Sequence, residues 1–191
     1  NPSMSTNIAV IGCGHVGLPL GIAFASRGGY RVTLVDINEP MVDMVNEGHF
    51  HFVEKGGQEA LRSVVGRTLH ATTKPDAIKD AEIVVIVTGT PVDEHLNPKV
   101  HDVMKVVDQY LPYLSAGQLI VLRSTLFPGI TEIIANYIQQ RKQGIGVAFC
   151  PERVAQGFAL EEIYNFPQMV SGIDHESEDS AGDIFFKIAT E

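Results

Sequence analysis

The chain has 191 residues, of which 45% are hydrophobic and 19% charged, a composition typical of a folded globular domain rather than of a disordered, collagen-like or coiled-coil chain. Asp and Glu number 23 against 14 Lys and Arg, and the net charge of −9 disfavours nucleic acid and anionic membranes as partners. Two cysteines, Cys13 and Cys150, are too few for a disulfide-stapled secreted scaffold, and we find no signal peptide or membrane-spanning apolar stretch. These features predict a cytoplasmic protein.

Short β-branched runs alternate with helix-like segments along the first half of the chain. The run at 7–12 ends in glycine, as a buried parallel strand does, and a mostly apolar segment follows it. Asn38, with Glu39 and Pro40 after it, is typical of a helix start. In chain order, the patterns predict a strand at 7–12, a helix at 15–27, a strand at 31–36, a helix between Asn38 and Gly48, a helix at 58–65, a strand at 69–71 and a helix capped by Thr73.

The second half continues the alternation, beginning with the most apolar strand pattern, EIVVIV. Its expected elements are a strand at 82–87, a loop at 88–98, a helix at 101–114, a strand at 118–122, a helix at 131–142, a strand at 146–150, a strand at 168–171 and a helix at 176–188. Strands that alternate with helices throughout predict an α/β fold, with a doubly wound, mostly parallel sheet of the Rossmann type. We see no linker, and Met4 is the first plausible initiator, so we expect one domain over 4–191.

A GxGxxG motif joins the first expected strand to the first expected helix. In this position Gly12 permits a tight turn, Gly14 lets the backbone approach a pyrophosphate, and Gly17 lets helix and strand pack closely. Amide N–H groups at the start of the helix, including those of His15 and Val16, would hold the phosphates. The motif therefore predicts a dinucleotide site.

An aspartate indicates which dinucleotide is bound. Asp36 ends the second expected strand about 20 residues after Gly17, where its carboxylate would accept hydrogen bonds from the adenine ribose hydroxyls. An anion there repels a 2′-phosphate, and neither Ile37 nor Asn38 supplies a cation to offset it. We therefore expect NAD rather than NADP as the cofactor.

Four further motifs or extensions of motifs occur in the order IGCGHVGLPL, GTPVDEHLNP, STLFPGIT and PERVAQGFALEEIYNFPQMVSG. Together they resemble the NAD-binding domain of the UDP-glucose and GDP-mannose dehydrogenases, which oxidise nucleotide sugars to uronic acids. Members of this family are about twice as long, with a linking helix and a C-terminal sugar-binding domain after the cofactor domain. The resemblance thus implies the N-terminal part of a longer enzyme. The PERV motif resembles that of members acting on UDP-N-acetylmannosamine or UDP-N-acetylglucosamine more closely than that of members acting on UDP-glucose.

The resemblance also implies roles for individual residues. Thr90 and Pro91 would lie along the nicotinamide side of NAD, and Ser124 and Thr125 beside the nicotinamide and the reacting sugar. Glu152 matches the glutamate that acts in the hydrolytic half of the reaction. The backbone that would face the sugar consists of Arg153, Val154, Ala155, Gln156 and Gly157, and Gln156 stands where many members have a second glutamate.

The reaction implied by the family oxidises carbon 6 of the sugar by two hydride transfers to two NAD molecules. A cysteine traps the intermediate aldehyde, and water, oriented or deprotonated by Glu152, cleaves the resulting thioester. The family's cysteine, with its lysine and asparagine helpers, lies beyond Glu191, so we expect the 191-residue chain alone to be inactive. Family members usually dimerise through the linking helix, so a homodimer or larger assembly is expected.

Several candidate residues also have ordinary structural explanations. Cys150 ends an apolar strand, where a thiol is usually an inert packed group, and Glu152 could cap or salt-bridge a loop. Ser124 and Thr125 could cap the turn before a proline. His49 and His51 lack a third ligand, so we expect no metal. The loop residues Asp93, Glu94 and His95 resemble an acid–base cluster but are more simply solvated.

Two other functions fit the same cofactor motif. One is a regulatory module that senses NAD without catalysis, and the other is a different NAD-dependent sugar or hydroxyacid dehydrogenase. Glu152 disfavours the first, because a sensor needs no hydrolytic carboxylate. The second would need a lysine or histidine base, and we find no convincing one in the chain.

Overall fold

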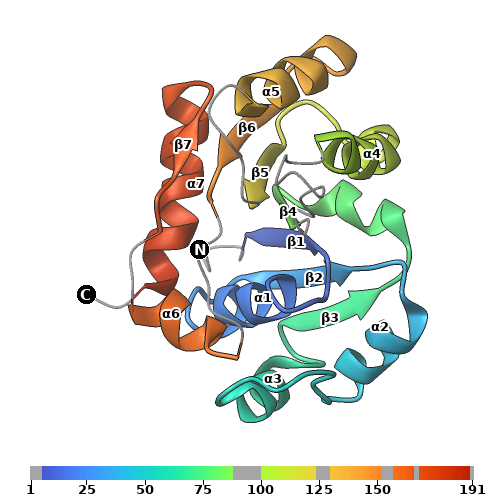
Figure 1. Cartoon of the computed structure of the whole chain (residues 1–191), viewed down its shortest axis with the longest axis vertical. Helices are drawn as coiled ribbons and strands as arrows, with labels where there is room; N and C mark the ends of the chain where they lie inside the picture. Colours follow the sequence, from blue (N-terminus) through green and yellow to red (C-terminus); the bar gives the residue numbers. More distant parts are fainter. Residues whose placement is uncertain (1–5, 88–99, 124–129, 152–156, 166–167, 190–191) are drawn as a thin grey trace, which may run out of the picture.

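The computed structural model describes residues 6–87, 100–123, 130–151, 157–165 and 168–189. Within these ranges a seven-stranded sheet has the order β3-β2-β1-β4-β5-β6-β7 (Figure 1). The first six strands are parallel, and β7 pairs antiparallel with β6 at one edge. The strands are β1 (Asn7–Ile11), β2 (Arg31–Val35), β3 (Leu69–Thr72), β4 (Ile83–Val87), β5 (Leu119–Arg123), β6 (Gly146–Phe149) and β7 (Ser171–Gly172).

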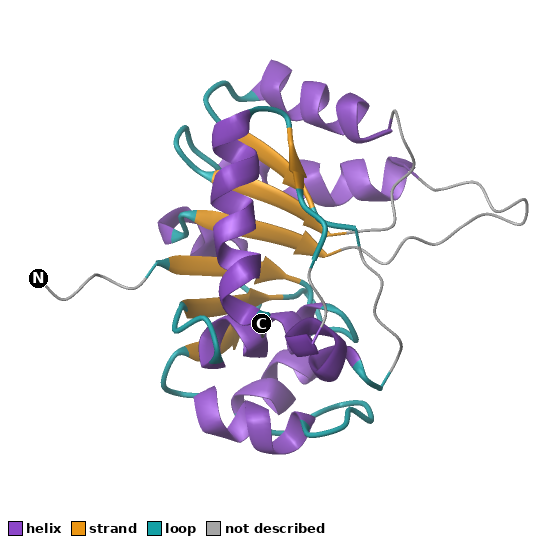
Figure 2. Ribbon diagram, turned by 90° about the vertical axis from the view of Figure 1, so that its left-hand side faces the viewer, coloured by secondary structure: helices purple, strands orange, loops and turns teal. Residues whose placement is uncertain are grey.

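Helices cover both faces of the sheet (Figure 2). The α-helices are α1 (Gly17–Ser26), α2 (Glu39–Asn46), α3 (Gly57–Val64), α4 (Val100–Tyr110), α5 (Ile130–Arg141), α6 (Ala159–Asn165) and α7 (His175–Ile188), with short 3₁₀ helices η1 (Pro75–Asp80) and η2 (Leu111–Tyr113). One buried cluster joins the sheet to α1, α2, α3, α6 and α7, and a second joins it to η1, α4, η2 and α5. The predicted doubly wound Rossmann-like architecture is confirmed.

The central strands are apolar at almost every position because both of their faces are buried. In β4, Ile83 and Val85 pack in the first cluster, while Val84 and Ile86 pack in the second. Alternate side chains of a strand point to opposite faces, so a strand covered on both sides must be hydrophobic throughout. This explains why EIVVIV is the clearest strand pattern in the sequence.

The strand order places a topological switch point at the centre of the sheet, between β1 and β4. From β1 the chain winds through β2 and β3 toward one edge, and then returns to β4 and winds through β5 and β6 toward the other. The connections after the neighbouring strands β1 and β4 therefore leave in opposite directions from the same end of the sheet. Ligands of open α/β sheets bind outside the carboxyl ends of the strands at such a switch point.

Three of the expected elements differ in kind, or are much shorter, in the structure. The helix expected after Thr73 is the six-residue 3₁₀ helix η1, which has Lys74 as N-cap and places Ile78 in the core within the short β3–β4 connection. The strand expected at 168–171 is replaced by the two-residue β7, and the Gln168 side chain before it accepts from Arg123 Nη1. The helix expected to reach residue 114 changes to η2 after Tyr110, since Pro112 lacks the N–H that an α-helix requires.

Helix α6 was not expected at all. Its seven residues are too few to display a helical period, although Ala159, Leu160 and Ile163 are all buried. The acidic residues Glu161 and Glu162 in its first turn are a weak signal, because negative charge is favourable at a helix start. Helix α1 also begins at Gly17, two residues later than expected.

Candidate functional site

The glycine loop, residues 12–17, forms a tight turn between β1 and α1. Gly12 has a φ of +116°, which favours glycine, and its N–H donates to the Val35 carbonyl at 2.8 Å. A Cβ on Gly17 would overlap the carbonyl oxygen of Gly12 and lie 2.7 Å from its carbonyl carbon. A side chain is therefore excluded at Gly17, where the helix crosses the end of the strand.

Gly14 has the opposite environment. A Cβ built on it would meet nothing within 4 Å, so the space beside the loop is open. Val16 is the N-cap of α1 and provides no side-chain hydrogen bond, and the first turn of the helix contains no acidic residue. The Leu18 N–H already donates to the Gly14 carbonyl at 3.1 Å, and Pro19 has no N–H. The donors that this end of α1 could offer a ligand are therefore those of the loop before Leu18, which lie at the positive end of the helix dipole.

Asp36 connects the end of β2 to the glycine loop. Its Oδ2 accepts a hydrogen bond from the Cys13 N–H at 2.9 Å, and its Oδ1 accepts one from the Asn38 N–H at 3.0 Å. The carboxyl is half-buried, whereas the neighbouring Ile37 is 81% exposed. Each carboxylate oxygen can accept more than one hydrogen bond, so these contacts leave lone pairs for a ligand. The loop-anchoring role of Asp36 was not expected.

A further segment that sequence reasoning missed lies against the glycine loop. His51 Nε2 donates to the Cys13 carbonyl at 2.7 Å, and the ring of Phe52 lies 4.2 Å from that of His15, centroid to centroid. The sequence pattern indicated His51 only as a partner of His49 in a metal-ligand pair. No group of three or more His, Cys, Asp or Glu side chains suited to a metal occurs in the part of the chain that the structure describes.

Both cysteines are buried and unpaired. Burial, reinforced by the negative charge of Asp36, raises the pKa of the Cys13 thiol to about 12. Burial also raises the pKa of Cys150, although Arg123 Nη1 donates to its Sγ at 2.9 Å and opposes the shift. Reactivity follows the thiolate form, so neither thiol is prepared to act as a nucleophile.

The Cys13 thiol should make the folded chain sensitive to alkaline pH. Unfolding lets the thiol titrate near its ordinary pKa of 9.0, whereas the folded chain keeps it protonated to about 12. Its contribution to stability is present below about pH 9 and is lost as the pH rises toward 12. The free energy of unfolding, measured with urea at about pH 8 and about pH 10.5, should fall less between these two pH values for Cys13→Ala than for the wild type. Equal losses in the two proteins would contradict this assignment.

Arg123 is a second residue that sequence reasoning missed. It ends β5, is 0% exposed, and donates from Nη1 to Cys150 Sγ and to Gln168 Oε1, both at 2.9 Å. Its Nε and Nη2 have no hydrogen-bond partner among the described residues. This side chain ties the ends of β5 and β6 to the segment before β7.

Most of the residues assigned through the resemblance lie outside the described ranges. These are Thr90, Pro91, Ser124, Thr125, Glu152, Arg153, Val154, Ala155 and Gln156. Gly157 is described, has a φ of +89°, and accepts a hydrogen bond from the Lys55 N–H at 3.0 Å. The strands that precede these residues are β4, β5 and β6. They are parallel to β1, so their carboxyl ends lie on the same side of the sheet as the glycine loop.

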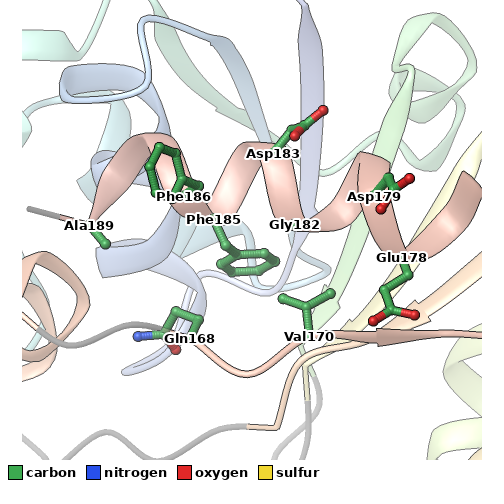
Figure 3. Close-up of a pocket in the computed structure, with 9 residues that line it drawn as sticks. All are labelled: Gln168, Val170, Glu178, Asp179, Gly182, Asp183, Phe185, Phe186 and Ala189. Atoms are coloured by element: carbon green, nitrogen blue, oxygen red, sulfur yellow. The ribbon is translucent and has the colours of Figure 1, made fainter. Parts of the chain in front are cut away.

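A pocket of about 690 Å³ lies elsewhere, between α7 and the segment before β7. Figure 3 shows its lining residues, which are Gln168, Val170, Glu178, Asp179, Gly182, Asp183, Phe185, Phe186 and Ala189. None of them belongs to the glycine loop. Three carboxylates in the wall would repel a diphosphate, so this pocket is a poor candidate for the dinucleotide.

Among the helices described, none is both long enough and apolar enough to cross a membrane.

Comparisons with known proteins agree with this geometry. The model of the UDP-glucose/GDP-mannose dehydrogenase family, NAD binding domain, matches residues 6–189. The UDP-N-acetyl-D-mannosamine dehydrogenase of Methanocaldococcus jannaschii is 34% identical over 187 residues, which are 96% of this chain and 43% of that protein. The Escherichia coli K12 enzyme of the same name is 33% identical over 179 residues, 87% of this chain and 42% of that protein.

A solved structure of a related enzyme has the same fold as this chain. The UDP-D-ManNAc dehydrogenase from Pyrococcus horikoshii matches with a TM-score of 0.90 and 26% identity, covering 97% of this chain and 45% of that one. The chain thus spans less than half the length of these relatives. It belongs to the UDP-glucose/GDP-mannose dehydrogenase family and forms the NAD-binding domain of that family.

Proposed function

We propose that this domain serves an enzyme that oxidises a UDP-sugar at carbon 6 to the uronic acid, in two successive hydride transfers to NAD. The observation that carries the proposal is the glycine loop at the switch point of the sheet, held by Asp36, within a chain that matches the family over residues 6–189. NAD supplies the hydride acceptor. The protein binds and orients that acceptor, and it brings the sugar to it.

The cofactor residues divide into two groups. The amides of Gly14, His15 and Val16 would hold the pyrophosphate, because they lie in the turn that leads into α1, where the helix dipole favours an anion. The remaining lone pairs of Asp36 would accept hydrogen bonds from the adenosine ribose hydroxyls. Its charge, with no cation at Ile37 or Asn38, would exclude NADP.

The residues on the nicotinamide side of NAD and those that act on the sugar would reach the site from the neighbouring strands. Thr90 and Pro91 follow β4, Ser124 and Thr125 follow β5, and Glu152 follows β6. Adjacent strands lie about 4.8 Å apart, so the connections after β4, β5 and β6 start progressively further from the glycine loop, in the direction from cofactor to sugar. In this arrangement Thr125 would contact the reacting carbon, and Glu152 would orient or deprotonate the hydrolytic water.

Two features bear on the substrate and on the activity of the chain itself. Relatives at 34% identity are named UDP-N-acetyl-D-mannosamine dehydrogenases, which favours a UDP-N-acetylhexosamine over UDP-glucose. By the resemblance, the nucleophilic cysteine and its lysine belong to the part of the family that follows this domain. We therefore expect the chain alone to bind NAD without oxidising a UDP-sugar, and the whole enzyme to be a homodimer or larger.

The stoichiometry of the reaction tests this function. An enzyme that contains the whole of this domain should reduce about two NAD for each UDP-N-acetylmannosamine or UDP-glucose consumed, as a four-electron oxidation requires. Absorbance of NADH, with the sugar quantified by chromatography, measures the ratio. A ratio of one would indicate an ordinary alcohol dehydrogenase. NAD binding without any reduction by that enzyme would instead indicate a sensor.

A further inference from the structure

Residues 49–56, here the bridging segment, touch two distant parts of the chain at once. They connect α2 to α3, and they contact both the glycine loop and residues 157–161. We propose that the bridging segment couples these two parts, so that NAD binding orders the start of α6. In this proposal His51 and Glu54 are positioning residues. The idea that residues near Gly157 face the sugar rests on the proposed function, whereas the coupling itself needs only NAD binding.

One end of the bridging segment is attached to the glycine loop. His51 Nε2 donates to the carbonyl of Cys13 at 2.7 Å, and the N–H of the same cysteine donates to Asp36 at 2.9 Å. Both backbone polar groups of Cys13 are thus engaged. The Phe52 ring lies 4.2 Å from that of His15, whose amide is a proposed phosphate donor. A ligand that fixes the loop would therefore also fix His51 and Phe52.

The other end is attached to residues 157–161. The Lys55 N–H donates to the Gly157 carbonyl at 3.0 Å, and Glu54 Oε1 accepts from the Leu160 N–H at 2.8 Å. Leu160 is in the first turn of α6, where amides lack intrahelical acceptors and a carboxylate is electrostatically favourable. The exposed pair of Lys55 and Glu161, at 3.6 Å, contributes little in comparison.

Contacts within the bridging segment, and with the residues on either side of it, connect its two ends. Gln58 closes its base, because its side chain donates to the Gly48 carbonyl and accepts from the Phe50 N–H. Phe50 and Phe52 pack edge to face with ring centroids 5.1 Å apart. At the far end, a Cβ on Gly57 would lie 2.7 Å from Phe50 and 2.9 Å from Glu54. A displacement of His51 would therefore be transmitted to Glu54.

The coupling would link NAD binding to the binding of a second ligand at residues 157–161. Ordering of the glycine loop by NAD would reduce the conformational freedom of Glu54, and hence of the Leu160 amide that it holds. A second ligand that needs residues 157–161 in place would then bind with a smaller entropic cost. By linkage, that ligand would strengthen NAD binding by the same factor.

Hydrogen exchange of the 191-residue chain with and without saturating NAD tests the proposal, with calorimetry to measure NAD affinity. In the wild type, NAD should slow exchange across residues 159–163 by about fivefold or more. This slowing should disappear in His51→Ala and in Glu54→Ala. It should persist in His51→Gln, which can still donate to the Cys13 carbonyl, and in Glu54→Gln, which can still accept from Leu160. The exposed His49→Ala is the matched control and should behave as the wild type.

The outcomes are distinguishable. NAD binding without slower exchange at 159–163 in the wild type would overturn the coupling and leave the proposed function intact. Retention of the full slowing by both alanine variants would overturn the coupling as well. Absence of NAD binding by calorimetry would overturn both proposals. If His51→Ala does not fold by circular dichroism, the comparison of Glu54→Ala with Glu54→Gln decides.

Discussion

Gly14→Val should abolish NAD binding while the chain stays folded. The Cβ position at Gly14 faces open space, and a Cβ there meets no protein atom within 4 Å. The same space is where the pyrophosphate would approach the backbone, and two methyl groups there would hold the phosphates away from the amides of the glycine loop. We expect affinity to fall at least about a hundredfold, a loss of about 2.7 kcal/mol, measured by calorimetry.

The control for Gly14→Val is a second open glycine. Gly182 also has nothing within 4 Å of its Cβ position, but it lies on α7 in the pocket of Figure 3. Gly182→Val should leave NAD affinity unchanged. Circular dichroism should be native for both variants. Unaltered affinity in folded Gly14→Val would refute the cofactor site, and lost affinity in Gly182→Val alone would move it to the α7 pocket.

Gly17→Ala should destabilise the chain by about 3 kcal/mol or more. The methyl group would overlap the backbone of Gly12, and neither backbone can yield without opening the turn between β1 and α1. Nine of the ten residues of helix α1 are buried, so a shift of its first turn disturbs the core. Urea unfolding at neutral pH measures the loss of stability.

Gly14→Ala is the matched change within the same loop. Because its Cβ position is open, it should alter stability by less than about 1 kcal/mol. The contrast separates the two glycines: Gly17 is required by the fold, and Gly14 by the ligand. Comparable stability of Gly17→Ala and the wild type would mean that the close packing of loop and helix is not needed.

The elements with strong local patterns could be predicted. β1, β4 and β5 are buried on both faces, so their apolar runs are unambiguous, and Gly12, Gly14 and Gly17 mark the turn after β1. The fold class follows from their alternation with helices. The elements that the patterns missed or misjudged are short, namely the seven residues of α6, the two of β7, the six of η1 and the three of η2. Such segments are held by distant partners, which a local pattern does not contain.

The site shows the same division. Asp36 could be recognised because its spacing from Gly17 is a property of one βαβ unit. Its bond to Cys13 connects residues 23 positions apart, the bond of His51 to Cys13 connects residues 38 apart, and that of Leu160 to Glu54 connects residues 106 apart. No spacing rule predicts such pairs. Arg123 follows the strand expected at 118–122, and nothing in the local pattern indicated that it is buried.

By itself, the amino-acid sequence determined an α/β fold with a glycine loop at its first turn, because hydrophobic periodicity and glycine act within a few residues. Only the tertiary structure decided what surrounds that loop. It brought the bridging segment onto Cys13, gave the start of α6 a carboxylate from Glu54, and left Arg123 buried beside Cys150. These contacts arise from the winding of the chain around the sheet, since the order of the strands decides which loops become neighbours.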